Sequence, residues 1–290
     1  MKLNQKLLLT RRAERCRRRM NLRVTSPEQA VEFVNDVGFC FLFPIQNVEM
    51  PSLWDAVAGR VVKTSNKHSG YEIERTWGWK DQSLGKKWWY YGKLLCKRAT
   101  LVSLDFLPVF YALSPNFGGD EDYLQDYEAG QLSWEAKNIL EALLGNGALD
   151  TVRLRRESRL AAESAKVAFE RALTELQVNL RVLPVGVAEA GAWRYAFVYD
   201  LVSRYFPQVV EQARSISRSV ARGKLLDQFL YNNVAASRKE IERVFGVLKW
   251  TSHEFEKTLE GLLEDRLVAM TRGEGLKGEQ FVSLRALESN

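Results

Sequence analysis

The chain has 290 residues, of which 46% are apolar and 27% are charged, which is the composition of an ordinary soluble globular protein with two or three compact domains. No apolar run approaches the roughly 18 to 20 residues of a membrane helix, and arginines directly follow the short apolar run 7–9, which argues against a secretory signal. Three scattered cysteines, Cys16, Cys40 and Cys96, and two histidines, His68 and His253, argue against a disulfide framework and a metal site, so we expect a cytoplasmic protein without a cofactor.

The net charge of +6 is concentrated in an N-terminal arm at 1–23, which holds nine Lys or Arg residues and one acid, so that the rest of the chain is slightly acidic. A helix in this arm would align Leu9, Ala13, Cys16 and Met20 in an apolar stripe. Around that stripe lie the arginines that we expect to contact the phosphates of a nucleic acid: Arg11, Arg12, Arg15, Arg17, Arg18 and Arg19. A transit peptide or a helix on a membrane surface would have a similar pattern and is the alternative interpretation.

A first domain is predicted at 24–128. Ser26 and Pro27 predict the start of a helix that Gly38 ends. The aromatic run 39–43 predicts a strand or a core turn, and a polar stretch then leads into a helix at 52–59. Residues 71–93 hold four of the eight tryptophans, interleaved with tyrosines and lysines. A short helix at 104–113 and a glycine-containing connection complete the domain.

A second domain, at 129–206, has the pattern of a winged helix. Ser133 is expected to cap a helix that ends at the glycines near 145–147, and Thr151 is expected to cap a second, shorter helix. A third helix is predicted at about 164–177. The apolar residues then alternate at 180–187 and 193–199, which predicts two strands around a tight turn, the wing.

The same order of parts returns in a third domain at 207–290. Helices are predicted at 220–232, 237–245 and 251–265, followed by a hairpin from 267–270 and 280–284. Equivalent parts are separated by somewhat over eighty residues, a spacing that indicates successive small domains rather than a solenoid. We therefore predict a mainly α-helical protein with small β wings, built from tandem winged-helix domains.

Five short motifs carry a resemblance to a known family: FPIQ at 43–46, PSLW at 51–54, TWGWKD at 76–81, YGKLL at 91–95 and LTELQ at 173–177. They resemble the winged-helix DNA glycosylase family that includes AlkZ and YcaQ, and in particular its AlkZ-related branch, over about residues 26–284. The resemblance implies tandem winged helices around a concave DNA-binding face and a glutamine motif that positions water. That motif is Gln, an apolar residue, then Gln or Asp; here it reads Pro44, Ile45, Gln46, so only Gln46 carries over.

The resemblance also implies hydrolysis of an N-glycosidic bond. Such a reaction passes through an oxocarbenium-like state, so the site needs an amide or a carboxylate to hold water and to stabilise positive charge on the sugar. We predict that Gln46 orients the water and that Glu49 or Asp81 acts as the base or as an electrostatic partner. In the alternative, structural interpretation, Gln46 and Asn47 cap a helix and Glu49 faces solvent.

Excision also requires the base to leave the helical stack, which aromatic faces and basic groups assist. The residues predicted to contact DNA in this way are Trp77, Trp79, Lys80, Lys86 and Lys87. In the structural alternative, most rings of the 71–93 window form core, with lysines at its edge. A Schiff base between Lys80 and the sugar is a separate hypothesis.

The helix predicted at 251–265 exposes Glu254, Glu256, Glu260 and Glu264, which phosphates would repel, so we expect it to be scaffold. The predicted function is a DNA glycosylase that acts on a damaged or modified base, with duplex DNA as its partner. The alternative is a noncatalytic winged-helix DNA-binding protein, such as a transcriptional regulator.

Overall fold

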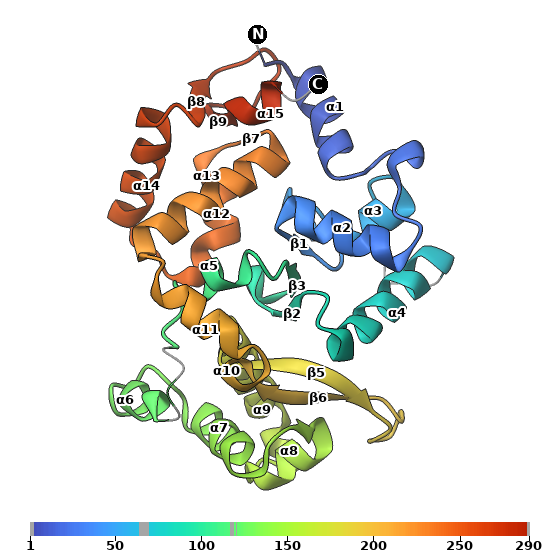
Figure 1. The fold of residues 1–290 in the computed structure, drawn as a ribbon, viewed down its shortest axis with the longest axis vertical. Helices are drawn as coiled ribbons and strands as arrows, with labels where there is room; N and C mark the ends of the chain where they lie inside the picture. The colour runs from blue at the N-terminus through green and yellow to red at the C-terminus, as the bar shows by residue number, and fades with distance from the viewer. Residues whose placement is uncertain (1–2, 64–69, 117–118, 120, 289–290) are drawn as a thin grey trace.

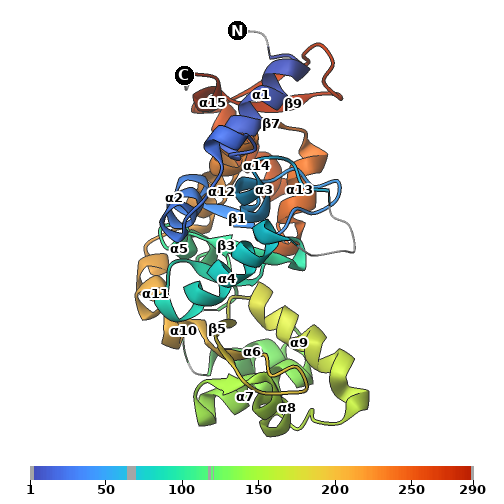
Figure 2. The same cartoon turned by 90° about the vertical axis from the view of Figure 1, so that its right-hand side faces the viewer.

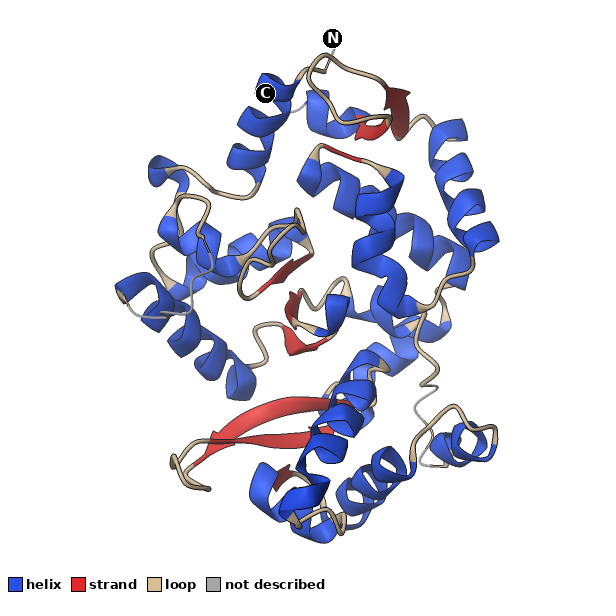
Figure 3. Cartoon of the chain, turned by 180° about the vertical axis from the view of Figure 1, so that it is seen from behind, coloured by secondary structure: helices blue, strands red, loops and turns tan. Residues whose placement is uncertain are grey.

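The chain is mainly helical with small antiparallel sheets, which confirms the predicted mixture of secondary structure (Figure 3). This computed structural model describes residues 3–63, 70–116, 119 and 121–288. His68 and Gly118 lie outside these residues. Of the two, Gly118 belongs to the connection predicted after 113. Within the described residues, no helix has the length and apolar character needed to cross a membrane.

One order of elements occurs three times: helix, strand, helix, helix, strand, strand. The first unit consists of α2 (Pro27–Val37), β1 (Phe39–Phe41), α3 (Leu53–Ala58), α4 (Tyr71–Lys86), β2 (Tyr90–Lys93) and β3 (Ala99–Val102). The second consists of α7 (Trp134–Asn146), β4 (Leu149–Asp150), α8 (Thr151–Glu157), α9 (Lys166–Val178), β5 (Val182–Ala188) and β6 (Ala196–Leu201). The third consists of α12 (Arg218–Asn233), β7 (Ala235–Ala236), α13 (Arg238–Phe245), α14 (Ser252–Glu264), β8 (Val268–Thr271) and β9 (Gln280–Ser283). In each unit the last strand lies in the middle of a three-stranded antiparallel sheet.

Local capping explains where most of these helices begin. The side chains of Ser26 and Ser133 accept hydrogen bonds from the first turns of α2 and α7, as predicted, and Gly38 ends α2 at a φ of 73°. The prediction for α8 is wrong: Asp150, not Thr151, is its cap, because the Asp150 carboxylate accepts from the amides of Val152 and Arg153. The Thr151 hydroxyl instead donates to the carbonyl of Phe197 on the adjacent strand.

The three units lie along the long axis of the molecule in the order third, first, second (Figure 1 and Figure 2). The first and third units share one hydrophobic core, in which the rings of Phe39 and Phe245 are 6.2 Å apart. Three connecting helices belong to this core: α5 (Leu107–Tyr111), α10 (Val202–Tyr205) and α11 (Pro207–Arg214). The second unit has its own core, on which α6 (Asp122–Glu128) packs. The first and third units therefore pack through a continuous apolar interior, to which the second unit also contributes Leu180 and, from β5, Leu183.

The N-terminal segment forms a helix, α1 (Gln5–Arg15), that reaches from the third unit towards the first (Figure 1). Leu3 and Leu8 pack on the third unit, beside the terminal helix α15 (Leu284–Glu288), and Cys16 is fully buried. The predicted apolar stripe is therefore wrong in register, because Leu9 and Met20 are exposed, at 55% and 60%. The helix turns a different face inward because it packs against a preformed apolar surface of the third unit.

We predict that Leu8→Ala lowers the free energy of unfolding by about 2–3 kcal/mol, because it removes buried methyl groups from a closed cluster. The neighbouring change Leu9→Ala, at an exposed position, should change it by less than about 0.5 kcal/mol. Chemical denaturation monitored by tryptophan fluorescence measures both values. Equal effects of the two substitutions would contradict the docking of α1.

Candidate functional site

The residues that resemble the glutamine motif form a tight turn directly after β1. The carbonyl of Ile45 accepts a hydrogen bond from the amide of Val48 at 3.1 Å, and Asn47 has a φ of 61°, a left-handed conformation that asparagine tolerates. Gln46 is exposed at this turn. Helix α3 is capped by Ser52 rather than by Gln46 or Asn47, so Gln46 does not have the structural role of the alternative interpretation.

This turn borders a cavity of about 590 Å³, a volume within the range of small-molecule sites. Its walls come from three regions: the turn itself with the segment after α3, the N-terminal arm, and the third unit. The lining residues include Gln46, Glu49, Asp55, Arg12, Arg18 and Glu240. Two of the three predicted catalytic residues, Gln46 and Glu49, therefore face one cavity.

Arg18 holds the first-unit side of this cavity together. Its Nε donates to Asp55 at 2.9 Å, one terminal nitrogen contacts Glu49, and the other donates to the carbonyl of Met50 at 3.0 Å. The Asp55 side chain is completely buried, and this burial raises the pKa of Asp55, while the Arg18 charge and three hydrogen bonds oppose the rise. Arg18 therefore compensates a buried carboxylate and fixes the position of Glu49.

Arg12 and Arg15 hold the other end of the arm on the third unit. Arg12 donates to the carbonyls of Asn233 and Ala235 at 2.8 and 2.6 Å. Arg15 donates to the Tyr231 hydroxyl, and its guanidinium lies 3.4 Å from the centre of that ring. The arm thus bridges the first and third units and forms one wall of the cavity.

A second polar cluster lies where α4 meets the hairpin β5–β6. The ammonium of Lys80 is fully buried and donates to the Tyr195 hydroxyl at 2.7 Å, and that hydroxyl donates in turn to Asp81 at 2.8 Å. Lys80 also contacts Asp81 directly. Four aromatic rings surround the ammonium, with centroids 4.4 to 5.5 Å away: Trp77, Tyr91, Tyr195 and Phe197. We call this cluster the Lys80 cage.

Burial determines the protonation chemistry of the cage. It lowers the pKa of Lys80, and Asp81 opposes that change. It strongly raises the pKa of Tyr195, and the hydrogen bond to Asp81 raises it further, so this hydroxyl keeps its proton and remains a donor. The cage therefore joins α4 of the first unit to the hairpin segment of the second through hydrogen bonds and ring contacts.

Two of the motifs identified in the sequence meet at the same interface. The side-chain oxygen of Gln177, on α9, accepts the amide of Lys93, on β2, at 2.9 Å. Gln177 is almost completely buried and its amide group donates to Leu173 on its own helix. Because both polar atoms of Gln177 are used, it specifies how α9 lies against β2.

The comparisons with known proteins give one match. The sequence model of the family described as AlkZ related matches residues 24–246. The chain belongs to the AlkZ-related family. No curated protein and no solved structure matches it.

The AlkZ-related match covers the turn with Gln46, the Lys80 cage and Gln177. It does not cover every residue that lines the cavity beside Gln46 and Glu49. Arg12 and Arg18 precede the matched residues, while Glu240 lies inside them. The third unit is also only partly matched, because α14 and the hairpin β8–β9 follow residue 246. The N-terminal arm and the end of the third unit, which pack on each other, thus lie on either side of the AlkZ-related segment.

The six arginines of the arm that are predicted to contact phosphates all have partners within the protein. Arg12, Arg15 and Arg18 point into the protein, with hydrogen bonds to internal partners. The other three arginines make surface ion pairs, Arg11 and Arg19 with Glu14 and Arg17 with Asp36. The partners of Arg12, Arg15 and Arg18 come from distant parts of the chain, which the charge pattern of the arm does not reveal.

The window 71–93 contains both buried side chains, which form core, and exposed side chains, which are accessible to a partner. Trp79 and Lys80 are buried, because tertiary packing covers both, so neither presents a free surface to DNA in this structure. Trp77 is 40% exposed, and Lys86 and Lys87 are exposed on the surface. Asp81 belongs to the Lys80 cage and does not line the cavity of Gln46 and Glu49.

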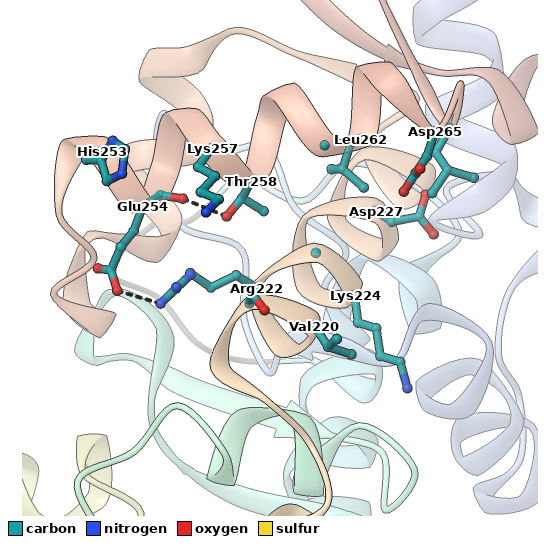
Figure 4. A pocket seen from close by; sticks show the side chains of 14 residues that line it. Val220, Arg222, Lys224, Asp227, His253, Glu254, Lys257, Thr258, Leu262 and Asp265 are labelled. Atoms are coloured by element: carbon teal, nitrogen blue, oxygen red, sulfur yellow. Dashed lines mark hydrogen bonds and ion pairs between the residues drawn. The ribbon is translucent and has the colours of Figure 1, made fainter.

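The third unit has a cavity of similar size, about 610 Å³, between α12 and α14 (Figure 4). It contains none of the predicted site residues. Glu254 pairs with Arg222 at 2.7 Å across it, and Glu256 pairs with Arg238 nearby. Two carboxylates of α14 therefore form ion pairs within the third unit. The interpretation of α14 as scaffold stays a prediction. No group of three or more His, Cys, Asp or Glu side chains in the described residues is placed to hold a metal ion.

The hairpin tip contains a residue that sequence reasoning did not select as functional. Trp193 is 91% exposed at the turn between β5 and β6. In the sequence its period-2 spacing with Tyr195 and Phe197 indicated an ordinary strand residue. Only the position of the turn relative to the rest of the protein distinguishes Trp193 from Tyr195 and Phe197, which are less exposed and pack on the Lys80 cage.

We predict that Arg18→Ala lowers the free energy of unfolding by about 3–5 kcal/mol at neutral pH, because Asp55 is left as an uncompensated buried charge. The Asp55 pKa is already raised by burial, and loss of Arg18 should raise it further. A carboxyl group whose folded pKa exceeds its unfolded value destabilises the protein when ionised, and this penalty disappears as the pH falls through the folded pKa.

The deficit of Arg18→Ala relative to wild type should therefore shrink from about pH 8 to about pH 5. The control is Arg19→Ala, whose partly exposed pair with Glu14 should contribute less than about 1 kcal/mol. Denaturant titrations at both pH values provide the test, and a deficit that does not change with pH would argue against a buried charge at Asp55.

Proposed function

We propose that this protein is a DNA glycosylase that hydrolyses the N-glycosidic bond of a damaged or modified base. Membership of the AlkZ-related family supports a glycosylase-like role with DNA as the partner. The observation that carries the proposal is the placement of exposed Gln46 and of Glu49 at one cavity of about 590 Å³. A base that has left the stack needs a pocket of this kind beside its sugar.

In the proposed reaction Gln46 orients the attacking water through its amide. Glu49 accepts the proton from that water or stabilises the positive charge that develops on the sugar. The contact with Arg18 holds the Glu49 carboxylate in one orientation. Asp81, which was the third predicted catalytic residue, is assigned instead to the Lys80 cage.

We further propose that the three units are tandem winged-helix domains, within 24–128, 129–206 and 207–290. The repeated order of elements and the central position of the last strand in each sheet support this assignment. The hairpin β5–β6 would be the wing of the second domain, and its tip carries the exposed ring of Trp193. Aromatic rings of this kind stack on bases or on the sugar edge of a groove, so the tip is the proposed DNA contact.

A second candidate function is supported by one departure from the family pattern. Pro44 stands where the family motif has its first glutamine, and proline supplies no side-chain group that could hold water. A winged-helix DNA-binding protein without catalytic activity, such as a regulator, would tolerate this residue. It would bind a preferred duplex sequence and release no base.

The proposed activity predicts abasic sites in DNA that carries a suitable modified base. Purified protein is incubated with duplexes containing different modified bases, and hot alkali then cleaves any abasic site. Gln46→Ala and Glu49→Gln should each reduce the single-turnover rate at least about tenfold, equivalent to about 1.4 kcal/mol in transition-state stabilisation.

Gln208→Ala, an exposed glutamine on α11, is the matched control and should retain the wild-type rate. If a substrate is cleaved and neither Gln46→Ala nor Glu49→Gln slows it, the site assignment is wrong. If every duplex remains intact while one unmodified sequence is bound selectively, the regulator function is the correct one.

The proposed role of the hairpin predicts that Trp193→Ala weakens duplex binding by about 1–3 kcal/mol, the range measured for base–aromatic stacking. Trp134→Ala is a suitable control, because Trp134 is also exposed in the second unit but lies at the start of α7. Fluorescence anisotropy at a stated salt concentration measures both. Unchanged affinity for Trp193→Ala would exclude the tip as a DNA contact.

A further inference from the structure

The Lys80 cage connects two parts of the molecule that have different proposed tasks. On one side, Lys80 donates to Tyr195 and lies 4.5 Å from the ring of Phe197, and both residues belong to the hairpin segment that carries Trp193 at its tip. The hairpin β5–β6 packs along α4, the helix of Lys80 (Figure 1). A change in the position of the hairpin must therefore alter the surroundings of the buried ammonium.

On its other side the cage leads to the turn with Gln46. The ammonium of Lys80 lies 4.4 Å from the centre of the Trp77 ring, and the Trp77 ring lies 5.2 Å from that of Phe43. Phe43 also packs edge-on against Trp54 at 5.4 Å. Phe43 immediately precedes Pro44, where the turn begins, so its ring anchors the N-terminal end of the turn.

We propose that Lys80 is a positioning residue that couples the hairpin β5–β6 to the turn 44–48, so that contact at the hairpin tip adjusts the placement of Gln46. For its role in base excision, this inference rests on the proposed function. The coupling itself is a property of the fold. It runs from the hairpin through Tyr195 to Lys80, and then through Trp77 and Phe43 to the turn.

The charge on Lys80 explains why this contact can act as a coupling element. A buried ammonium must keep its hydrogen-bond acceptors and its aromatic neighbours, because an unpartnered charge in an apolar environment is very unfavourable. Tyr195 comes from the hairpin, whereas Asp81 and Trp77 come from α4. Lys80 therefore keeps its hydrogen bond to Tyr195 only when the hairpin lies against α4, and displacing the hairpin removes that bond while the contact with Asp81 on its own helix stays.

The direct test uses Lys80→Met in the full chain and amide hydrogen exchange of the free protein. Methionine fills a similar volume, and the Asp81 side chain that loses its ammonium partner is 32% exposed and keeps its hydrogen bond from Tyr195, so the variant should fold. Exchange in residues 43–49 should become about threefold faster or more, because Trp77 loses its cation and no longer holds Phe43 in one orientation. Exchange in α7, within the separate core of the second unit, should not change.

Gln82→Met is the matched control, since Gln82 is an exposed residue on the same helix. Faster exchange at 43–49 in Lys80→Met alone supports the coupling, and unchanged exchange there overturns it. Tyr195→Phe removes the hydroxyl and keeps the ring, so it provides the same test by a smaller change if Lys80→Met does not fold. This part of the experiment needs neither DNA nor catalytic activity.

A second measurement connects the coupling to excision. Lys80→Met should reduce the single-turnover rate on the order of tenfold while duplex affinity stays within about twofold of wild type, because a misplaced catalytic group affects the reaction more than binding. The double variant with Trp193→Ala should show a non-additive rate effect. If wild-type protein has no activity on any duplex, the proposed function is rejected, and the hydrogen-exchange result alone decides whether the coupling exists. If wild-type protein is active, but the rate effects of the two substitutions are additive and exchange at 43–49 is unchanged, the coupling is rejected and the proposed function is retained.

Discussion

The buried carboxylate of Asp55 imposes the strongest single requirement on this fold. A charged group with no solvent exposure needs a counter-charge and several hydrogen bonds, and Arg18 supplies the charge from a segment more than thirty residues earlier. To bring Arg18 to Asp55, the N-terminal segment must pass over the first unit. The preceding helix α1 is then positioned to reach the third unit, where Arg12 and Arg15 find main-chain carbonyls and the Tyr231 ring.

The candidate site is a consequence of this arrangement. The turn 44–48 alone would present Gln46 to open solvent, but Arg12 and Arg18 from the arm and Glu240 from the third unit complete a cavity around it. The same Arg18 that compensates Asp55 also contacts Glu49. Fold stability and the orientation of a proposed catalytic carboxylate therefore depend on one guanidinium, whose planar fork can satisfy both acids and the Met50 carbonyl at once.

The interfaces between units differ in their physical character. The first and third units share a large apolar core, which tolerates small changes in packing. The second unit contributes Leu180 and Leu183 to that core, and it is also joined to the first unit through directional groups, the Lys80 cage and the hydrogen bond from the Lys93 amide to Gln177. Directional contacts specify one orientation and are lost together when it changes. The position of the hairpin β5–β6 is accordingly the property of the molecule most sensitive to single polar side chains.

By itself the sequence determined the local structure and the family. Serine and glycine signals located the ends of α2 and α7, the switch from helical to alternating apolar spacing located the hairpin β5–β6, and short motifs indicated the AlkZ-related family before any contact was known. These features are readable because capping and periodicity depend on residues only a few positions apart.

Only the tertiary structure decided which charged residues are available to a partner. The arginines of the arm and Lys80 have the sequence context of DNA contacts, yet several are buried against acceptors that come from 31 to 223 positions away. The same holds for Trp193, whose spacing matches that of Tyr195 and Phe197 in the Lys80 cage while its own ring is almost fully exposed. Whether a side chain is enclosed depends on surfaces contributed by distant segments, and a pattern within one segment contains no information about those surfaces.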